Sequence, residues 1–148
     1  MRTGRRRLLT LFIMTILLAS NVTFARDVRG IWFVQEESAI EIYDCGAATL
    51  CGRVVWLIRP KNDDFNPDPA RRGRSVCRID VMWGLQQLGP GHWDHGTIYD
   101  PRSGKRYKLM LRLDETGALT ARAYRFIRRL GQDLVLRRAE PKDIGRSC

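Results

Sequence analysis

The fold is decided by the stretch Glu41-Ile42-Tyr43-Asp44-Cys45-Gly46-Ala47-Ala48-Thr49-Leu50-Cys51-Gly52-Arg53-Val54-Val55-Trp56-Leu57-Ile58. Two runs rich in β-branched and aromatic residues flank a turn of small residues, which is the pattern of a β-hairpin. Cys45 and Cys51 stand at the two ends of this turn, where paired strands bring Cβ atoms within disulfide reach. A ring of this size contributes about 2 kcal/mol by the loop-closure estimate. Two buried free thiols are the alternative.

The N-terminus has the pattern of a secretory signal peptide. Four arginines precede a short apolar run over residues 8–19, and Thr23-Phe24-Ala25 places small residues where a signal peptidase reads them. The apolar run is shorter than the roughly 20 residues that a membrane span needs, so an uncleaved anchor is the less favoured alternative. We therefore expect a signal peptide over residues 1–25, a mature domain over residues 26–148 and a periplasmic location.

The mature chain is basic. Without the four arginines of the signal, 22 basic residues remain against 16 acidic ones, a net charge of +6. The arginines are scattered rather than clustered on one helix, and export removes the usual nucleic-acid partner, so nucleic-acid binding is disfavoured. The remaining interpretations are a soluble barrel exterior and attraction to an anionic lipid or polymer of the cell envelope.

The chain has an even number of cysteines, four in all, which favours disulfides in an exported protein. Once Cys45 is paired with Cys51, Cys77 and Cys148 are left as the second pair by subtraction. A free Cys148, or one paired between molecules, is the alternative.

Short strands separated by turns recur along the mature chain, with no long helical periodicity. Residues 105–113 alternate most clearly, with apolar side chains on one face and basic ones on the other. Strands are expected over residues 30–35, 38–44, 50–58, 79–87, 92–99, 105–113, 118–126 and 132–138. Eight strands joined by short turns predict an all-β, single antiparallel up-and-down barrel, with a two-sheet sandwich as the alternative.

One connection is unusually long. Residues 59–78 carry three prolines, a glycine and many charges without periodicity, and loops of this length in compact domains are often functional. We expect either a lid over one end of the barrel or a surface strap. The candidate lid residues are Asn66, Asp68, Arg72 and Arg74.

Several segments follow one another in a characteristic order. Gly30-Ile31-Trp32 opens the domain, the cysteine hairpin follows, and Asn66-Pro67-Asp68-Pro69-Ala70 precedes Arg72 and Arg74. Gly96-Thr97-Ile98-Tyr99-Asp100-Pro101 and Gly104-Lys105-Arg106-Tyr107 complete the series. In this order the segments resemble the domain-of-unknown-function 2147 family, which consists of small exported bacterial proteins. The resemblance implies a calycin-like or lipocalin-like barrel and no established activity.

The last third of the chain departs from that family. The family's Gly-rich strand is replaced by Ala123-Tyr124-Arg125, and its closing Trp-x-Arg by Leu134-Val135-Leu136-Arg137, which lacks the tryptophan. The resemblance therefore implies the barrel, and a ligand pocket shared with other members does not follow from it.

Catalytic and metal-binding patterns are weak. His92 and Asp94 share one face of a strand and His95 the other, so three convergent ligands would need a bulge, and we expect exposed histidines. No serine stands in a nucleophile-elbow context. The acidic pairs at residues 36–37 and 63–64 lie in expected loops, where nothing raises a carboxyl pKa. We expect no catalytic residues, no metal and no cofactor, with a hydrolase as the least favoured function.

The function favoured by these observations is binding of a small amphipathic or lipid-like molecule in the barrel of a monomeric, non-enzymatic protein. The candidate pocket residues are Trp56, Trp83, Tyr99 and Tyr107. The alternative is an interaction module of the cell envelope, in which a basic outer face meets anionic lipid or polymer. The residues of that face are Arg106, Lys108, Arg112 and Arg122.

Overall fold

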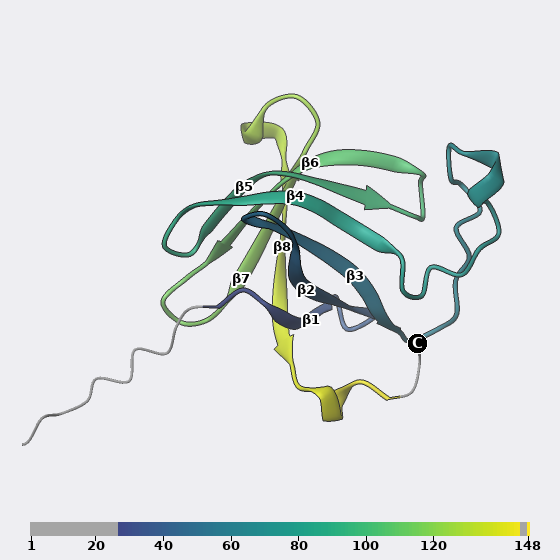
Figure 1. Ribbon diagram of the computed structural model, residues 1–148, viewed down its shortest axis with the longest axis horizontal. Helices are drawn as coiled ribbons and strands as arrows, with labels where there is room; N and C mark the ends of the chain where they lie inside the picture. The colour runs from purple at the N-terminus through teal and green to yellow at the C-terminus, as the bar shows by residue number, and fades with distance from the viewer. Residues whose placement is uncertain (1–26, 146–147) are drawn as a thin grey trace, which may run out of the picture.

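Eight strands form one closed antiparallel barrel in the computed structural model, which describes residues 27–145 and residue 148 (Figure 1). Each strand pairs with the next along the chain, and β8 closes the barrel on β1. The strands are β1 (Gly30–Val34), β2 (Ser38–Gly46), β3 (Thr49–Leu57), β4 (Asp80–Gly89), β5 (His92–Asp100), β6 (Lys105–Leu113), β7 (Leu119–Tyr124) and β8 (Gln132–Ala139).

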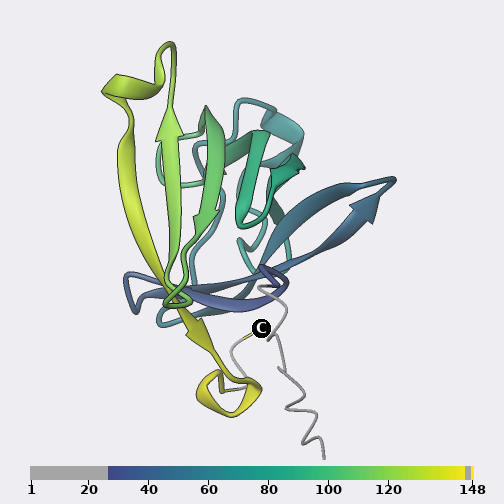
Figure 2. The ribbon, with the colours of Figure 1, turned by 90° about the vertical axis from the view of Figure 1, so that its left-hand side faces the viewer.

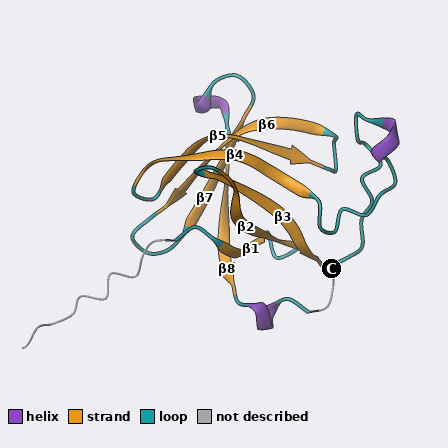
Figure 3. Ribbon diagram, in the orientation of Figure 1, coloured by secondary structure: helices purple, strands orange, loops and turns teal. Residues whose placement is uncertain are grey.

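In the described residues, three short 3₁₀ segments lie outside the strands, η1 (Pro69–Arg71), η2 (Arg128–Leu130) and η3 (Pro141–Asp143) (Figure 3). The predicted up-and-down barrel is confirmed, and each expected strand coincides with an observed one to within two residues at either end. Within the described part of the chain, no helix has the length and apolar character needed to cross a membrane. The signal peptide predicted over residues 1–25 lies outside that part.

The alternation seen in the sequence sets the inner and outer faces of the barrel. On β6, Leu109, Leu111 and Leu113 are buried in the interior, while Arg106 and Arg112 are exposed on the outside. Successive side chains of a strand point to opposite faces, so the apolar set of each strand enters the same interior.

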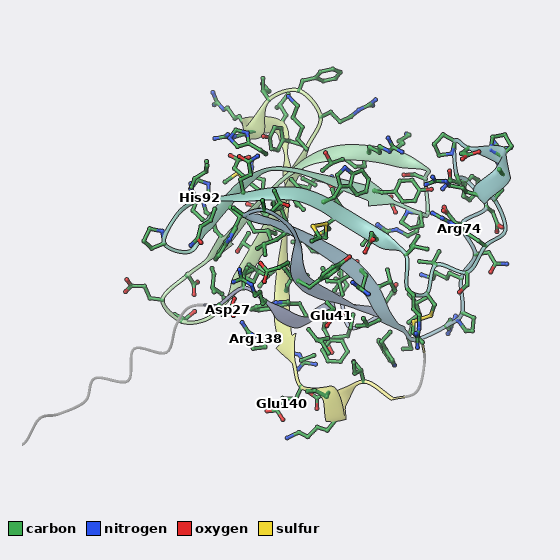
Figure 4. All side chains as sticks on the ribbon, in the orientation of Figure 1. Asp27, Glu41, Arg74, His92, Arg138 and Glu140 are labelled. Carbon is green, nitrogen blue, oxygen red and sulfur yellow. A yellow bond between two sulfur atoms is a disulfide. The ribbon has the colours of Figure 1, made fainter. Side chains whose placement is uncertain are left out.

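One end of the barrel is filled by side chains around Trp32. The indole ring is fully buried, and its Nε1 donates a hydrogen bond to the carbonyl oxygen of Val28 (2.8 Å). The guanidinium of Arg138 lies over the ring, 4.2 Å from its centre, and donates to the carbonyl oxygens of Arg29 (3.0 Å) and Asp27. Figure 4 shows Arg138 beside Asp27 near β1. The first and last strands are thereby joined across the closed end.

A second apolar cluster lies on the outside of the barrel. Phe33 and Trp56 pack edge to face, with ring centres 5.6 Å apart, and Ile144 from the C-terminal tail covers them. The apolar run over residues 54–57 divides between the interior and this outer cluster. Val54 faces the interior, whereas Trp56 belongs to this covered outer cluster.

Both predicted disulfides are present. Cys45–Cys51 closes the β2–β3 hairpin, with Cα atoms 5.6 Å apart. Cys77–Cys148 joins the end of the β3–β4 connection to the C-terminus, with Cα atoms 5.5 Å apart. No free cysteine occurs in the described residues.

Candidate functional site

The barrel contains a cavity of about 1240 Å³. Its inner wall is aliphatic, and small side chains on β7, Ala121 and Ala123, leave space where larger ones would fill it. The apolar lining consists of Val34, Ile40, Val54, Leu57, Val76, Val81, Met82, Ile98, Leu109, Ala121, Ala123, Leu134 and Leu136. An apolar hollow of this size can hold a small molecule with a hydrocarbon portion.

Four connections border the mouth of this cavity. The lining includes residues 35 and 37 between β1 and β2, residues 60–62, 64 and 65 between β3 and β4, residues 100–102 at the end of β5 and in the turn before β6, and residues 125–127 and 130 between β7 and β8. Figure 2 shows the β3–β4 and β7–β8 connections at the same, upper end of the barrel, with the C-terminus at the lower end. The cavity is thus closed near Trp32 and opens among these loops.

The β3–β4 connection is attached to the barrel through a buried carboxylate. Asp63 is fully buried, and the hydroxyl of Tyr99 on β5 donates to its Oδ1 at 2.5 Å. Its Oδ2 accepts from the amide of Asn66 (2.6 Å) and lies 3.4 Å from Nε of Arg74. The carboxylate therefore joins two points of the connection to a strand of the wall.

The predicted lid residues hold this connection in shape. Asp68 accepts a hydrogen bond from the backbone of Ala70 and caps η1, and Nε of Arg72 donates to the carbonyl oxygen of Asn66. None of Asn66, Asp68, Arg72 and Arg74 lines the cavity; their neighbours at positions 60–62, 64 and 65 do. The turn before β6 is packed on the same loop, because a Cβ at Gly104 would lie 1.9 Å from the carbonyl oxygen of Phe65.

Tyr99 has a perturbed phenol. Burial, together with the hydrogen bond to Asp63 and the negative charge of that carboxylate, raises the pKa of Tyr99 to about 12 from its ordinary value of 10.0. Between these two values the unfolded chain releases the Tyr99 proton and the folded chain keeps it. The contribution of this group to stability is therefore fully present below pH 10 and lost as the pH rises toward about 12.

We expect Asp63→Asn to lower the pKa of Tyr99 from about 12 toward 10, because the negative charge is removed while burial is retained. The measurement is a titration of tyrosinate absorbance, with Tyr99→Phe identifying the contribution of this residue among the four tyrosines. A Tyr99 pKa equal in Asp63→Asn and the wild type would contradict the role given to Asp63.

The four aromatic residues predicted as pocket walls fall into two groups. Tyr99 and Tyr107 line the cavity, whereas Trp56 and Trp83 do not. Trp56 lies in the outer apolar cluster, and Trp83 lies under the guanidinium of Arg106, 5.6 Å from the ring centre. The expectation was made from residue type alone, but the register shift in the β2–β3 pairing turns Trp56 outward, and Trp83 lies on the outer face with Arg106.

The segment over residues 92–95 contains a bulge. The register between β5 and β6 shifts between Trp93 and Gly96, and His95 has φ 63°. As a result Asp94 is almost fully buried on the outer side and pairs with Arg128 at 2.5 Å, while His95 is exposed and His92 half-buried. Within the described residues, no group of three or more His, Cys, Asp or Glu side chains is placed to hold a metal ion.

A smaller groove of about 380 Å³ lies on the outer wall, where the β7–β8 connection folds against β6 and β7. Arg112, Arg122, Arg128 and Arg129 line it, with Asp133 as the acidic member. Arg112 and Arg122 were expected on the outside of the barrel, whereas their position in one groove with Arg128 and Arg129 was not predicted. The signal that points to the connection is the run of three arginines and three apolar residues over 125–130, which ends before Gly131.

The sequence profile of a bacterial family, described as "Uncharacterized protein conserved in bacteria (DUF2147)", matches residues 30–138. The chain belongs to this family. Its fold is similar to a solved structure described as "Protein HP1028 from the human pathogen Helicobacter pylori belongs to the lipocalin family", with a TM-score of 0.70 and 20% sequence identity. The similarity covers 79% of this chain and 86% of the other, and it shows a lipocalin-like fold. No functionally curated protein matches the sequence significantly.

Proposed function

We propose that this member of the family is a non-enzymatic protein that binds a small amphipathic or lipid-like molecule inside the barrel. The observation that carries the proposal is the cavity of about 1240 Å³ with an aliphatic wall, closed at one end and open among loops at the other. Burial of hydrocarbon in such a cavity supplies the driving force, and a few polar groups fix the orientation of the ligand.

The polar groups near the mouth favour an anionic or hydroxylated head group. Lys61 faces Glu37 at 3.9 Å, and Arg102 pairs with Asp100, so these charges are partly satisfied. Arg125 borders the cavity and contacts the ring of Phe126 but no carboxylate of the described residues. A carboxylate or phosphate on the ligand would supply the partner that Arg125 lacks.

Tyr107 offers a second polar contact deeper in the cavity. It lines the cavity from β6, and its hydroxyl makes no hydrogen bond within the described residues. Tyr99 lines the same cavity, but its hydroxyl already donates to Asp63. Tyr107 can therefore donate to an oxygen of a ligand without breaking an existing bond.

We expect the mature protein to bind saturated fatty acids with a Kd that falls about fourfold for each added methylene, which is about 0.8 kcal/mol per buried CH₂. Displacement of a fluorescent fatty acid by acids of increasing chain length measures the series. Ala121→Phe is expected to weaken binding by about tenfold or more, because the new ring occupies part of the cavity.

The matched control is Val135→Phe, which adds the same ring at an exposed position on the outside of β8. Thermal unfolding of both variants verifies that each is folded. Fatty-acid affinity that is independent of chain length, or equal in Ala121→Phe and the wild type, would show that ligands do not enter this cavity.

A further inference from the structure

The connection between β7 and β8 presents a group of apolar side chains to solvent. Phe126, Ile127 and Leu130 are 82%, 55% and 78% exposed. Figure 2 shows this connection projecting beyond the ends of β7 and β8 at the upper end of the barrel. Exposed apolar side chains that cluster at one projecting tip, rather than being scattered, indicate a contact surface.

The tip is held in a defined position by the barrel wall. Nε of Arg122 on β7 donates to the carbonyl oxygen of Arg128 (2.8 Å), and Nη1 of Arg122 donates to Asp133 (2.7 Å). Arg128 in turn pairs with the buried carboxylate of Asp94 at 2.5 Å. These contacts fix the backbone of the connection against the wall and leave its apolar side chains exposed at the mouth of the cavity.

The charge around this tip is strongly positive. The outer groove beneath it is lined by Arg112, Arg122, Arg128 and Arg129, with Asp133 already paired to Arg122. Arg112 and Arg129 have no carboxylate partner within the described residues, and Arg125 has none either. An anionic group can therefore be received here without displacing an existing acid.

We propose that the β7–β8 connection docks on the surface of an anionic phospholipid bilayer. Phe126, Ile127 and Leu130 enter the interfacial region, and the arginines contact the phosphate groups. Because residues 125–127 and Leu130 also line the cavity, docking brings its mouth to the membrane, and the hydrophobic ligand enters from the bilayer. This last step rests on the proposed ligand-binding function, whereas the docking itself does not.

The alternative occupants of this surface fit less well. A second copy of the chain, related by two-fold symmetry, would bring the same arginines toward one another, which is electrostatically unfavourable. A phospholipid surface offers an apolar layer for the exposed side chains of the tip and phosphate groups for its arginines.

The experiment is sedimentation of the mature protein with vesicles of phosphatidylcholine alone or mixed with phosphatidylglycerol. We expect binding to the mixed vesicles that weakens with added salt, and a loss of about tenfold or more in the double variant Phe126→Ser/Leu130→Ser. The matched control is Leu88→Ser, which removes an apolar side chain of β4 that is 54% exposed and does not line the cavity. It is expected to bind as the wild type does.

A second pair of variants separates docking from ligand binding. Arg112→Glu/Arg129→Glu changes the outer groove but no residue that lines the cavity, so it is expected to lose vesicle binding and to keep its affinity for a fatty acid in solution. Ala121→Phe is expected to show the opposite behaviour. If vesicle binding persists while no fatty acid binds, the proposed function fails and the docking stands.

Three results would overturn the docking proposal. The first is a wild-type protein that does not sediment with either kind of vesicle. The second is equal binding by Phe126→Ser/Leu130→Ser and Leu88→Ser. The third is a wild-type protein that does not bind vesicles but forms a concentration-dependent dimer in analytical ultracentrifugation. If Phe126→Ser/Leu130→Ser abolishes that dimer, the tip contacts a second copy of the chain.

Discussion

Replacing Trp32 with alanine is expected to lower the free energy of unfolding by about 3–5 kcal/mol, the range for large buried aromatic residues. The side chain is fully buried at the closed end of the barrel, and its indole nitrogen donates to the carbonyl oxygen of Val28. The variant loses this burial and this bond, and the guanidinium of Arg138 loses the ring that it covers. Domains of this size are stable by about 5–15 kcal/mol in total.

The measurement is equilibrium unfolding in urea, and Trp83→Ala is the matched control. Trp83 is half-buried on the outer face under Arg106, so its replacement is expected to cost about 1 kcal/mol. Trp32→Phe keeps most of the ring but leaves the Val28 carbonyl without its donor, and it is expected to fall between the two. Equal destabilisation by Trp32→Ala and Trp83→Ala would contradict the assignment of Trp32 to the closed end.

The barrel could be predicted from the sequence because one physical signal repeats in every strand. Alternation over residues 105–113 gave β6 its correct bounds, and the small residues between Cys45 and Cys51 located the hairpin. Closure on β1 was inferred from the number of strands, and the pairing of Ile31–Val34 with β8 establishes it. Periodicity carries this information because it reflects which face of a strand is buried.

The residues that line the interior of the barrel were harder to predict, because register shifts between strands determine which side chains face inward. The β2–β3 pairing shifts between Ala39 and Ile40, where Ala39 is paired with Trp56 and Ile40 with Val54. Trp56 therefore faces outward two residues after an inward Val54, which simple alternation would not give. The role of Arg138 was not predicted either. The segment compared with the family ended at the neighbouring Arg137, whereas Arg138 is the residue that covers Trp32.

The β7–β8 connection at the mouth of the cavity could not be predicted for a different reason. A strand was expected to continue to residue 126, but β7 ends at Tyr124 and leaves Phe126 in a projecting connection. Composition alone does not distinguish an apolar residue that ends a strand from one that is presented to solvent. The buried pair Asp63–Tyr99 could not be predicted either, because its two residues are 36 positions apart in the chain and no local pattern connects them.

The two disulfides differ sharply in the stability that we expect from each. Cys77–Cys148 spans 71 residues, and the loop-closure estimate for a ring of this length is about 4 kcal/mol. Cys45–Cys51 spans 6 residues, and the same estimate gives about 2 kcal/mol. Replacing Cys77 and Cys148 together with serine is therefore expected to be the more destabilising change.

The longer disulfide also connects two parts of the molecule that bear on the site. Cys77 follows Val76, which lines the cavity, and Nε of Arg78 donates to the carbonyl oxygen of Cys148 (3.0 Å). Urea unfolding of Cys77→Ser/Cys148→Ser and of Cys45→Ser/Cys51→Ser measures both costs, and fatty-acid titration of the folded variants measures the effect on the site. We expect weaker fatty-acid binding only in the first variant. Cys45–Cys51 lies in the part of the β2–β3 hairpin between Ile40 and Val54, and no residue between these two lines the cavity. Equal affinities in the two variants would show that the β3–β4 connection keeps its position without the covalent link.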